Sequence, residues 1–327
     1  MADALPEVSG YETYLKKSTW GTFKLQEVSE DDVRLIMKGQ QPKLSCGIDT
    51  INNKVVKTCS RELAQPMTII INKSIRESKV PLLYKQARIL PLYKKGAAND
   101  CGNYRPVSLL SALSKILEKA VCRQLMYFLD NSPILCDNQY GFRSKHQTTH
   151  AVQHMMNVIT NASTQDKVTI ATYIDLSKAF DCLQYNKLFN KLYHIGFSQS
   201  SLNWFKNYLS ERQQCVDLEG ETSPWLDVKL GVPQGSILGP ILFLIYVNDI
   251  NNCNEHAEYT KFADDTTILT SGSTLESAVA RMNKSLERAD LWFKRNKLNL
   301  NPSKTRYMLF NSKSEETQLV KIGNTLH

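Results

Sequence analysis

The chain has 327 residues, of which 42% are hydrophobic, 9% aromatic and 22% charged. This composition is globular, and it excludes a disordered chain, a collagen and a coiled coil. The net charge of +8 is concentrated in residues 79–126, which hold nine Lys and Arg but only two acidic residues. A local positive block favours a polyanionic partner, namely nucleic acid, nucleotide phosphates or a membrane surface. A solvated helix face is the alternative interpretation.

We expect neither a secretory signal at the start of this sequence nor a membrane-spanning segment within it. Residues 1–7 are acidic and lack an apolar core, which excludes a secretory signal there. The longest apolar run, 237–247, is too short to cross a bilayer. The eight cysteines follow neither C-x-x-C nor zinc-finger spacing, a pattern typical of reduced thiols in an intracellular protein. The sequence does not decide between nucleus and cytoplasm, and it leaves the oligomeric state open.

The first half of the chain is predicted to be mainly helical around one short strand. No linker or repeat divides the sequence, which favours one continuous body with subdomains. In chain order, capping and periodicity predict a short helix after Ser29, a helix over 58–78, a strand over 86–93, a loop over 99–103, and helices over 106–129 and 148–162. His146, His150 and His154 lie four residues apart, but no carboxylate or cysteine is near, so we expect a surface or packing role.

The second half alternates strands and helices. In chain order we expect a strand over 167–176, a helix over 185–210, a hairpin over 216–230 turning at 219–221, a buried helix over 236–248, strands over 259–263 and 266–270, an amphipathic helix over 274–296 and a strand over 307–310. From residue 167 onward, this order is compatible with a ferredoxin-like split βαβ sheet.

Three carboxylates stand at strand ends of this predicted sheet. The 167–176 strand carries Asp175 near its end, and Asp264 and Asp265 occupy the turn between the next two strands. Such a sheet brings them together, and their repulsion calls for a hard divalent cation, above all Mg²⁺. Two metals ~3.5–4 Å apart would stabilise the attacking and leaving oxygens of an in-line phosphoryl transfer. Two adjacent Asp residues also suit an ordinary turn, so this pair alone is weak support.

Five segments surround these acids and the positive block. In chain order they are 90–96, LPLYKKG; 103–109, NYRPVSL; 173–181, YIDLSKAFD; 231–236, GVPQGS; and 259–265, YTKFADD. The ordered set resembles reverse transcriptases, most closely those of non-LTR (LINE-type, jockey-like) retrotransposons. The resemblance runs from about 47–49 to 301–305 and covers most of the chain.

The resemblance implies an α+β fold with the fingers and palm of a right-hand polymerase. The palm would be a ferredoxin-like split βαβ antiparallel sheet with helices on one face. Residues 1–57 would form an N-terminal extension, 58–166 the fingers and 167–327 the palm with some fingers elements inserted, all within a single reverse transcriptase domain over about 47–327. Because the chain stops at His327, we expect the thumb to be missing and the chain to be a fragment or a truncated copy.

The resemblance also implies roles for individual residues. Asp175 and Asp264 would bind the metals, with Asp265 in support. The residues that would contact the nucleotide are Lys94 or Lys95 with Arg105 at the triphosphate, Phe180 as steric gate beneath the sugar, Gln234 and Gly235 in the nucleotide and template pocket, and Lys304. Phe180 could instead be simple core, and Lys304 a solvated strand-edge lysine. Adjacent residues of a strand point to opposite faces, so Lys94 and Lys95 cannot both reach the phosphates.

The implied function is RNA-directed DNA polymerase, a reverse transcriptase that adds dNTPs to a primer 3′ end. It would use Mg²⁺, with Mn²⁺ as an alternative, and no other small-molecule cofactor. Its partners would be an RNA template, a DNA primer and dNTPs, without a membrane. A catalytically silent nucleic-acid-binding remnant or domesticated protein is the alternative function. An RNA polymerase with a similar palm is disfavoured, because the ring of Phe180 would exclude a 2′-hydroxyl.

Overall fold

The computed structural model describes residues 9–16, 20–254, 256–311, 321–322 and 325–326. Residues 1–7, on which the expectation of no secretory signal rests, lie outside the described residues. The chain forms two compact units of discontinuous segments. The first unit comprises Met1–Lys16, Leu135–Gln184 and Phe243–His327, and the second comprises Lys17–Ile134 and Tyr185–Leu242. These limits differ from the expected boundaries at 57 and 166. All eight cysteines are free thiols.

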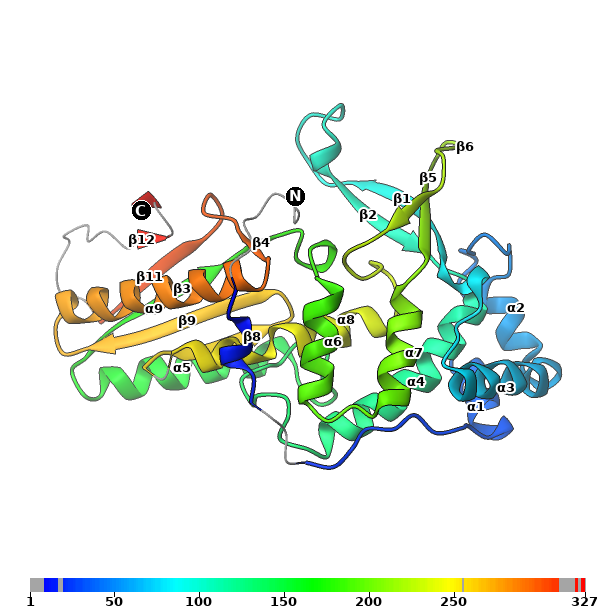
Figure 1. The fold of residues 1–327 in the computed structure, drawn as a ribbon. Coiled ribbons are helices and arrows are strands. Elements are labelled where there is room, and N and C mark those ends of the chain that lie inside the picture. The colour runs from blue at the N-terminus through cyan, green and yellow to red at the C-terminus, as the bar shows by residue number, and fades with distance from the viewer. Residues whose placement is uncertain (1–8, 17–19, 255, 312–320, 323–324, 327) are drawn as a thin grey trace. The chain divides into compact units, whose positions relative to one another are not determined.

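The first unit is built on a four-stranded antiparallel sheet (Figure 1). Its order is β11-β3-β9-β8, from β3 (Val168–Ile174), β8 (Glu258–Phe262), β9 (Asp265–Gly272) and β11 (Arg306–Phe310). The central strand β3 is largely buried along its length. This agrees with its sequence, VTIATYI, which is β-branched and mostly apolar and does not alternate strictly between apolar and polar residues.

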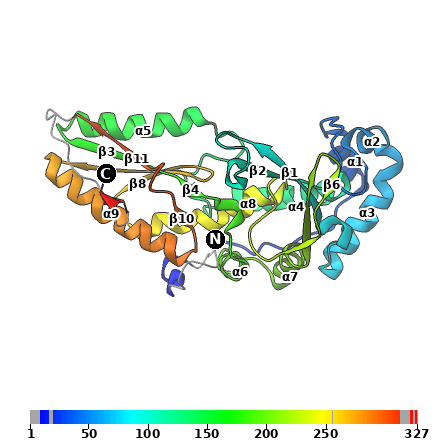
Figure 2. The ribbon, with the colours of Figure 1, turned by 90° about the horizontal axis from the view of Figure 1, so that it is seen from above.

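Helices cover both faces of this sheet. Helix α5 (Thr148–Ser163) packs Ile159 against Ala171 and Leu269. Helix α9 (Leu275–Arg295) covers the other face, where the neighbouring Thr270 hydroxyl donates to the Ala278 carbonyl at 3.5 Å. Figure 2 shows α5 and α9 on opposite sides of the strands. The expectation of helices on one face is therefore wrong for α5, because β3 is buried on both faces and is covered on both.

Short elements complete the first unit. In chain order they are η2 (Tyr11–Tyr14), β4 (Leu176–Ser177), η5 (Ala179–Asp181), η6 (Asn248–Cys253), β10 (Asn299–Leu300), β12 (Lys321–Ile322) and β13 (Thr325–Leu326). Strand β4 pairs with β10, and β12 pairs with β13. The rings of His146 and His154 lie 5.7 and 6.2 Å from that of Tyr140, as expected of a packing role.

The second unit contains a mixed sheet surrounded by helices. Strand β1 (Gln86–Tyr93) pairs antiparallel with β2 (Tyr104–Leu109) and parallel with β5 (Arg212–Leu218). Strand β5 also pairs with β6 (Glu221–Thr222) and β7 (Leu226–Val228). The N-terminal part of this unit also contains α1 (Glu30–Lys38), α2 (Asn53–Thr58), α3 (Ser60–Glu77), η3 (Leu82–Lys85) and η4 (Cys101–Asn103). Helix α8 (Leu238–Val247) begins in this unit and ends in the first.

Two helix predictions in the second unit are corrected by the structure. The expected helix over 106–129 begins later, as α4 (Ala112–Asp130), whose first turn is capped by the Ser111 side chain. Proline disfavours the helical conformation in the residue before it, and the residues around Pro106 pair with β1 instead. The helix expected over 185–210 is two helices, α6 (Tyr185–His194) and α7 (Gln199–Leu209). Gly196 lies between them with φ 102°.

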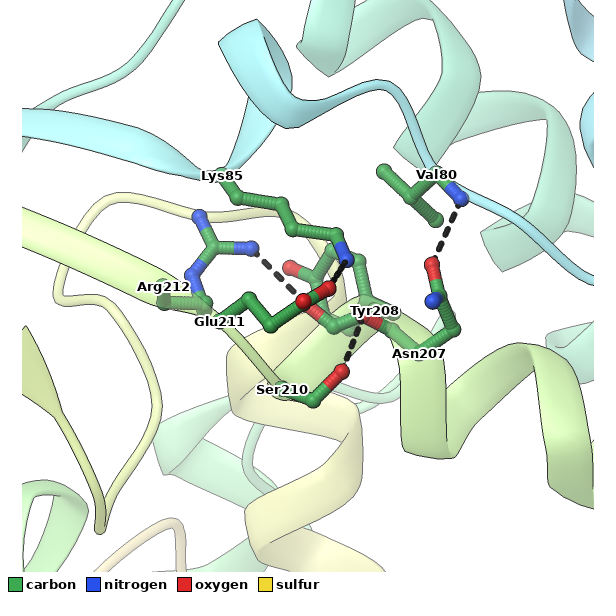
Figure 3. A network of polar contacts seen from close by, with 7 residues as sticks. All are labelled: Val80, Lys85, Asn207, Tyr208, Ser210, Glu211 and Arg212. Carbon is green, nitrogen blue, oxygen red and sulfur yellow. Dashed lines mark hydrogen bonds and ion pairs between the residues drawn. The ribbon is translucent and has the colours of Figure 1, made fainter.

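Buried cations stabilise the second unit from inside (Figure 3). Lys85 is 1% exposed, and its Nζ lies 3.3 Å from the Glu211 carboxylate. Arg212 is 2% exposed and donates at 3.0 Å to the carbonyl of Tyr208, in the last turn of α7. Arg88 pairs with Asp217 at 3.0 Å. Lys85 and Arg88 belong to the positive block, so part of that charge stabilises the fold instead of facing a partner.

None of the helices in the described part of the chain is long and apolar enough to cross a membrane.

Candidate active site

The three predicted carboxylates meet at one end of the first unit's sheet. Strand β3 pairs antiparallel with β9, with Ile174 opposite Thr266. Continuing that register by one residue sets Asp175, just beyond the end of β3, opposite Asp265, the first residue of β9. Paired residues share a face of the sheet, so the register directs these two side chains to the same side.

Asp264 joins them from the hairpin between β8 and β9. Phe262 pairs with Asp265, so Ala263 and Asp264 form the turn, and Ala263 has φ 61°. The turn is therefore one residue earlier than predicted. Partial burial raises the pKa of Asp265, and the charges of Asp264 and Asp175 raise it further. The three carboxylates are thus close enough to repel one another.

The loop over residues 301–305 holds the backbone of Asp175. The Asn301 N–H donates to the Asp175 carbonyl at 2.9 Å. On the other side, the Asp175 N–H donates to the Thr305 hydroxyl at 3.5 Å, and that hydroxyl donates to the Asn301 carbonyl at 2.9 Å. The same loop carries Lys304, whose Nζ lies 3.8 Å from Asp175 Oδ2. The structure therefore brings Lys304 to the acids, in an ion pair.

The three carboxylates fit a divalent cation whose remaining coordination positions are filled by other ligands. Asp175 Oδ2 is buried and accepts no hydrogen bond from any described residue. Within the described ranges, no group of three or more His, Cys, Asp or Glu side chains forms a ready metal cage. Mg²⁺ is commonly held by one or two carboxylates, with waters and substrate phosphates as the remaining ligands. An incomplete set of carboxylates at the end of a sheet agrees with that chemistry.

Phe180 lies between two other aromatic rings. It belongs to η5, which follows Lys178 with φ 51°. Its ring centroid is 4.5 Å from that of Phe243 and 6.5 Å from that of Phe142, and the residue is only partly buried. A half-covered ring is consistent both with a wall beneath a bound sugar and with ordinary packing, so both interpretations stay open.

The basic residues predicted to meet the triphosphate lie in the second unit, on the β1–β2 hairpin. Lys94 and Lys95 follow β1, and Arg105 lies in β2 opposite Leu92. All three side chains are exposed. No ion pair involves any of them within the part of the chain that is described. Their charges are available to a polyanion.

The loop that carries Gln234 and Gly235 is packed against β2. The Ser108 N–H donates to the Gln234 carbonyl at 2.8 Å. Gly235 has φ 131°, and a Cβ atom there would lie 2.7 Å from the Ser108 carbonyl oxygen. The close packing at Gly235 is therefore against the chain's own backbone.

Two residues important for these sites escaped the sequence prediction. Glu118, fully buried in α4, accepts from the N–H groups of Ile237 and Leu238 at 2.5 and 3.3 Å, and so holds the start of α8. Gln139, also buried, contacts the turn that carries Asp264. Glu118 lies on the apolar face of a helix and Gln139 in an irregular segment, so periodicity marks neither. For Glu118 the sequence did offer a signal, because an acidic residue stands there among the apolar residues of a helix face.

Comparison with known proteins adds independent support. The family described as "Reverse transcriptase (RNA-dependent DNA polymerase)" matches residues 92–322. The chain is 29% identical over 289 residues to "Probable RNA-directed DNA polymerase from transposon BS" of Drosophila melanogaster, covering 86% of this chain and 32% of that protein. It is 25% identical to "RNA-directed DNA polymerase from mobile element jockey" of the same species, covering 96% and 35%. The chain thus spans about a third of the length of these relatives.

Proposed function

Because the chain belongs to the reverse transcriptase family, we propose that it carries the polymerase centre of an RNA-directed DNA polymerase. The observation that carries this proposal is the meeting of Asp175, Asp264 and Asp265 at one end of an antiparallel sheet. Its substrates would be dNTPs, and its partners an RNA template and a DNA primer. The relatives' names state RNA-directed DNA polymerase activity for those longer proteins.

The sheet order supports a palm of the split βαβ type. Its strands follow one another in the chain as β3, β8, β9 and β11, but lie side by side as β11-β3-β9-β8. The β8–β9 hairpin is thereby placed next to β3, which positions two acids beside the third. We assign the palm to the first unit, and the fingers to the second unit with its basic hairpin.

The chemistry would be an in-line phosphoryl transfer. Asp175 and Asp264 would hold Mg²⁺ or Mn²⁺, with Asp265 in support; bound metal stabilises charge on the attacking and leaving oxygens. Lys304 balances the charge of Asp175 before substrate arrives. Arg105, with Lys94 or Lys95, would bind phosphate oxygens, since an arginine can form two parallel bonds to them whereas a lysine acts as a point charge.

Three further residues would shape the nucleotide site. The Phe180 ring, left half-exposed by its neighbours, would occupy the space that a 2′-hydroxyl needs. Gln234 and Gly235 would line the nucleotide and template pocket, in a loop fixed to β2 through Ser108. Because the Phe180 ring would leave no space for a 2′-hydroxyl, the site would favour deoxynucleotides over ribonucleotides.

Primer extension tests the proposal. The chain is incubated with poly(rA)/oligo(dT), dTTP and Mg²⁺, beside the matched variant Asp264→Asn. We expect dTMP incorporation by the chain and its loss in the variant. Binding of the duplex without any incorporation, unchanged in Asp264→Asn, would instead favour a catalytically silent nucleic-acid-binding protein.

A further inference from the structure

A short segment outside the sheet lies along the strand that leads to the catalytic turn. Residues 138–141, called the strap below, run beside β8. The Lys261 N–H donates to the Asn138 carbonyl and the Tyr140 N–H donates to the Lys261 carbonyl, both at 2.8 Å. The bridge between Gln139 and Lys261 is parallel. The strap therefore pairs with the edge strand at Lys261, two residues before the turn formed by Ala263 and Asp264.

The strap is itself firmly held. The Cys136 N–H, just before it, donates to Asn248 Oδ1 at 3.0 Å. From the other side, Arg143 Nη1 donates to the carbonyls of Cys136 and Gln139 at 3.1 and 3.4 Å. Because both ends of the strap are fixed, the strap can hold the backbone that it contacts in one conformation and does not need to adapt to it.

The Gln139 side chain links the strap to the turn. It is 1% exposed. Its Oε1 accepts two backbone hydrogen bonds, from the Gly141 N–H at 2.9 Å and from the Ala263 N–H at 3.2 Å. Ala263 directly precedes Asp264 and has a left-handed φ of 61°. Such a conformation is costly for a residue other than glycine, so it needs a contact of this kind to hold it.

Gly141 brings the strap against the same peptide. A Cβ atom at this position would lie 2.2 Å from the Ala263 nitrogen and 2.9 Å from the Phe262 carbonyl carbon. Side chains do not approach backbone atoms so closely, so the strap can reach the turn only with glycine here. The backbone at Ala263 is thus contacted by Gln139 and by Gly141 at once.

We propose that Gln139 is a positioning residue of the metal site, which fixes the Ala263 peptide and through it the direction of the Asp264 carboxylate. The inference rests on the proposed function of Asp264. If this is so, the metal site requires the carboxamide oxygen of Gln139 and not the volume of its side chain. Gln139 touches neither metal nor substrate in this role.

Metal binding by the whole chain tests the inference without any need for turnover. Mn²⁺ is titrated into the protein and free Mn²⁺ is followed by electron paramagnetic resonance. Gln139→Met keeps the length of the side chain but removes the acceptor, and should weaken binding about 10-fold. Gln139→Glu keeps an acceptor oxygen and should bind at least as tightly as the original chain. Gln153→Met, on the exposed surface of α5, is the matched control and should change nothing.

The variants separate the possible failures. If Gln139→Met does not fold, Gln139→Asn replaces it, because its amide is retained but one methylene short of the Ala263 N–H. Wild-type Mn²⁺ affinity in the folded Met or Asn variant would overturn the inference, as would equal losses in Gln139→Glu and Gln139→Met. Asp264→Asn is measured beside them: unchanged Mn²⁺ binding in that variant would refute the metal site itself, and with it the proposed function.

Discussion

The acid centre of the first unit and the basic hairpin of the second unit are organised in opposite ways. Asp175, Asp264 and Asp265 repel one another: burial raises the pKa of Asp265, and the charges of Asp264 and Asp175 raise it further. They stay together because the backbone is fixed around them, by strand register, by the loop over 301–305 and by the strap. Lys94, Lys95 and Arg105 are exposed, with no ion pair among described residues to fix their side chains.

This difference shows which of the two groups of side chains is held in place before a substrate binds. Like charges that must meet need a rigid frame, and the folding energy of the frame offsets their repulsion. Exposed cations on a hairpin need no such frame, because a polyanion can order them when it binds. Substitutions at the acid centre should therefore remove activity altogether, whereas substitutions at the basic hairpin should give graded losses.

The largest expected effect is at the acid centre. Asp264→Asn removes a charged ligand of the proposed metal site at almost constant volume, so incorporation should fall more than about 100-fold. Asp265→Asn, a supporting position, should lose less. Steady-state primer extension measures both, and melting temperature checks the fold. If Asp265→Asn were the more damaging change, the assignment of the two acids would have to be exchanged.

The next effect is on stability, in the loop over 231–236. Gly235→Ala adds a Cβ atom 2.7 Å from the Ser108 carbonyl at φ 131°, and should cost about 2 kcal/mol of unfolding free energy. Gly220→Ala is the matched control, since Gly220 has φ 90° but no atom within 4 Å, and it should cost about 1 kcal/mol. Urea denaturation of both variants measures the difference. Equal costs would mean that the contact with Ser108 is easily relaxed.

A smaller effect concerns sugar selection. Phe180→Val should admit ribonucleotides and shift the ratio of kcat/KM for UTP over dTTP by at least ~10-fold, equal to ~1.4 kcal/mol. The ratio is measured in primer extension. A lower melting temperature with an unchanged ratio would instead make Phe180 an ordinary packing residue against Phe243.

The graded response of the basic hairpin should be smaller still. Arg105→Ala should raise the KM for dNTPs about fivefold, because the exposed charge contact that we propose to phosphate would be lost. Lys94→Ala and Lys95→Ala, made separately, show which lysine shares this role. Lys79→Ala, exposed in the same unit, serves as control. A total loss of activity in Arg105→Ala would show that this hairpin is as rigidly required as the acids.

The smallest effect is a pH dependence in the second unit. Burial raises the pKa of Glu118 above its ordinary value. Between the ordinary pKa of about 4.3 and the raised one, the folded state binds the proton more tightly, so stability falls as pH rises. Glu118→Gln can still accept from Ile237 and Leu238 but does not ionise. Its stability relative to the original chain should therefore increase from pH 5 to pH 8, as urea denaturation can measure; a decrease would reverse the sign of the shift.

The sequence predicted the parts of this structure that follow from local pattern. A β-branched, mostly apolar run marks β3, and two short predicted strands on either side of Asp264 and Asp265 mark the hairpin. The strand end and the hairpin turn were sufficient to bring three acids together. What the sequence missed depends on contacts between distant segments. Residues around Pro106 become β2 because β1 is beside them, and the strap is a single bridge with no periodicity.

The loop over 301–305 also sets the time at which the acid centre can form during synthesis. Asp175 is anchored by Asn301 and Thr305, which leave the ribosome some 126 to 130 residues after it. At about 5–20 residues per second, Asp175 waits many seconds for these partners, and β3 waits for β9 and β11 on both sides. The acid centre can therefore reach its final geometry only after residues 301–305 have emerged, well after Asp175 itself.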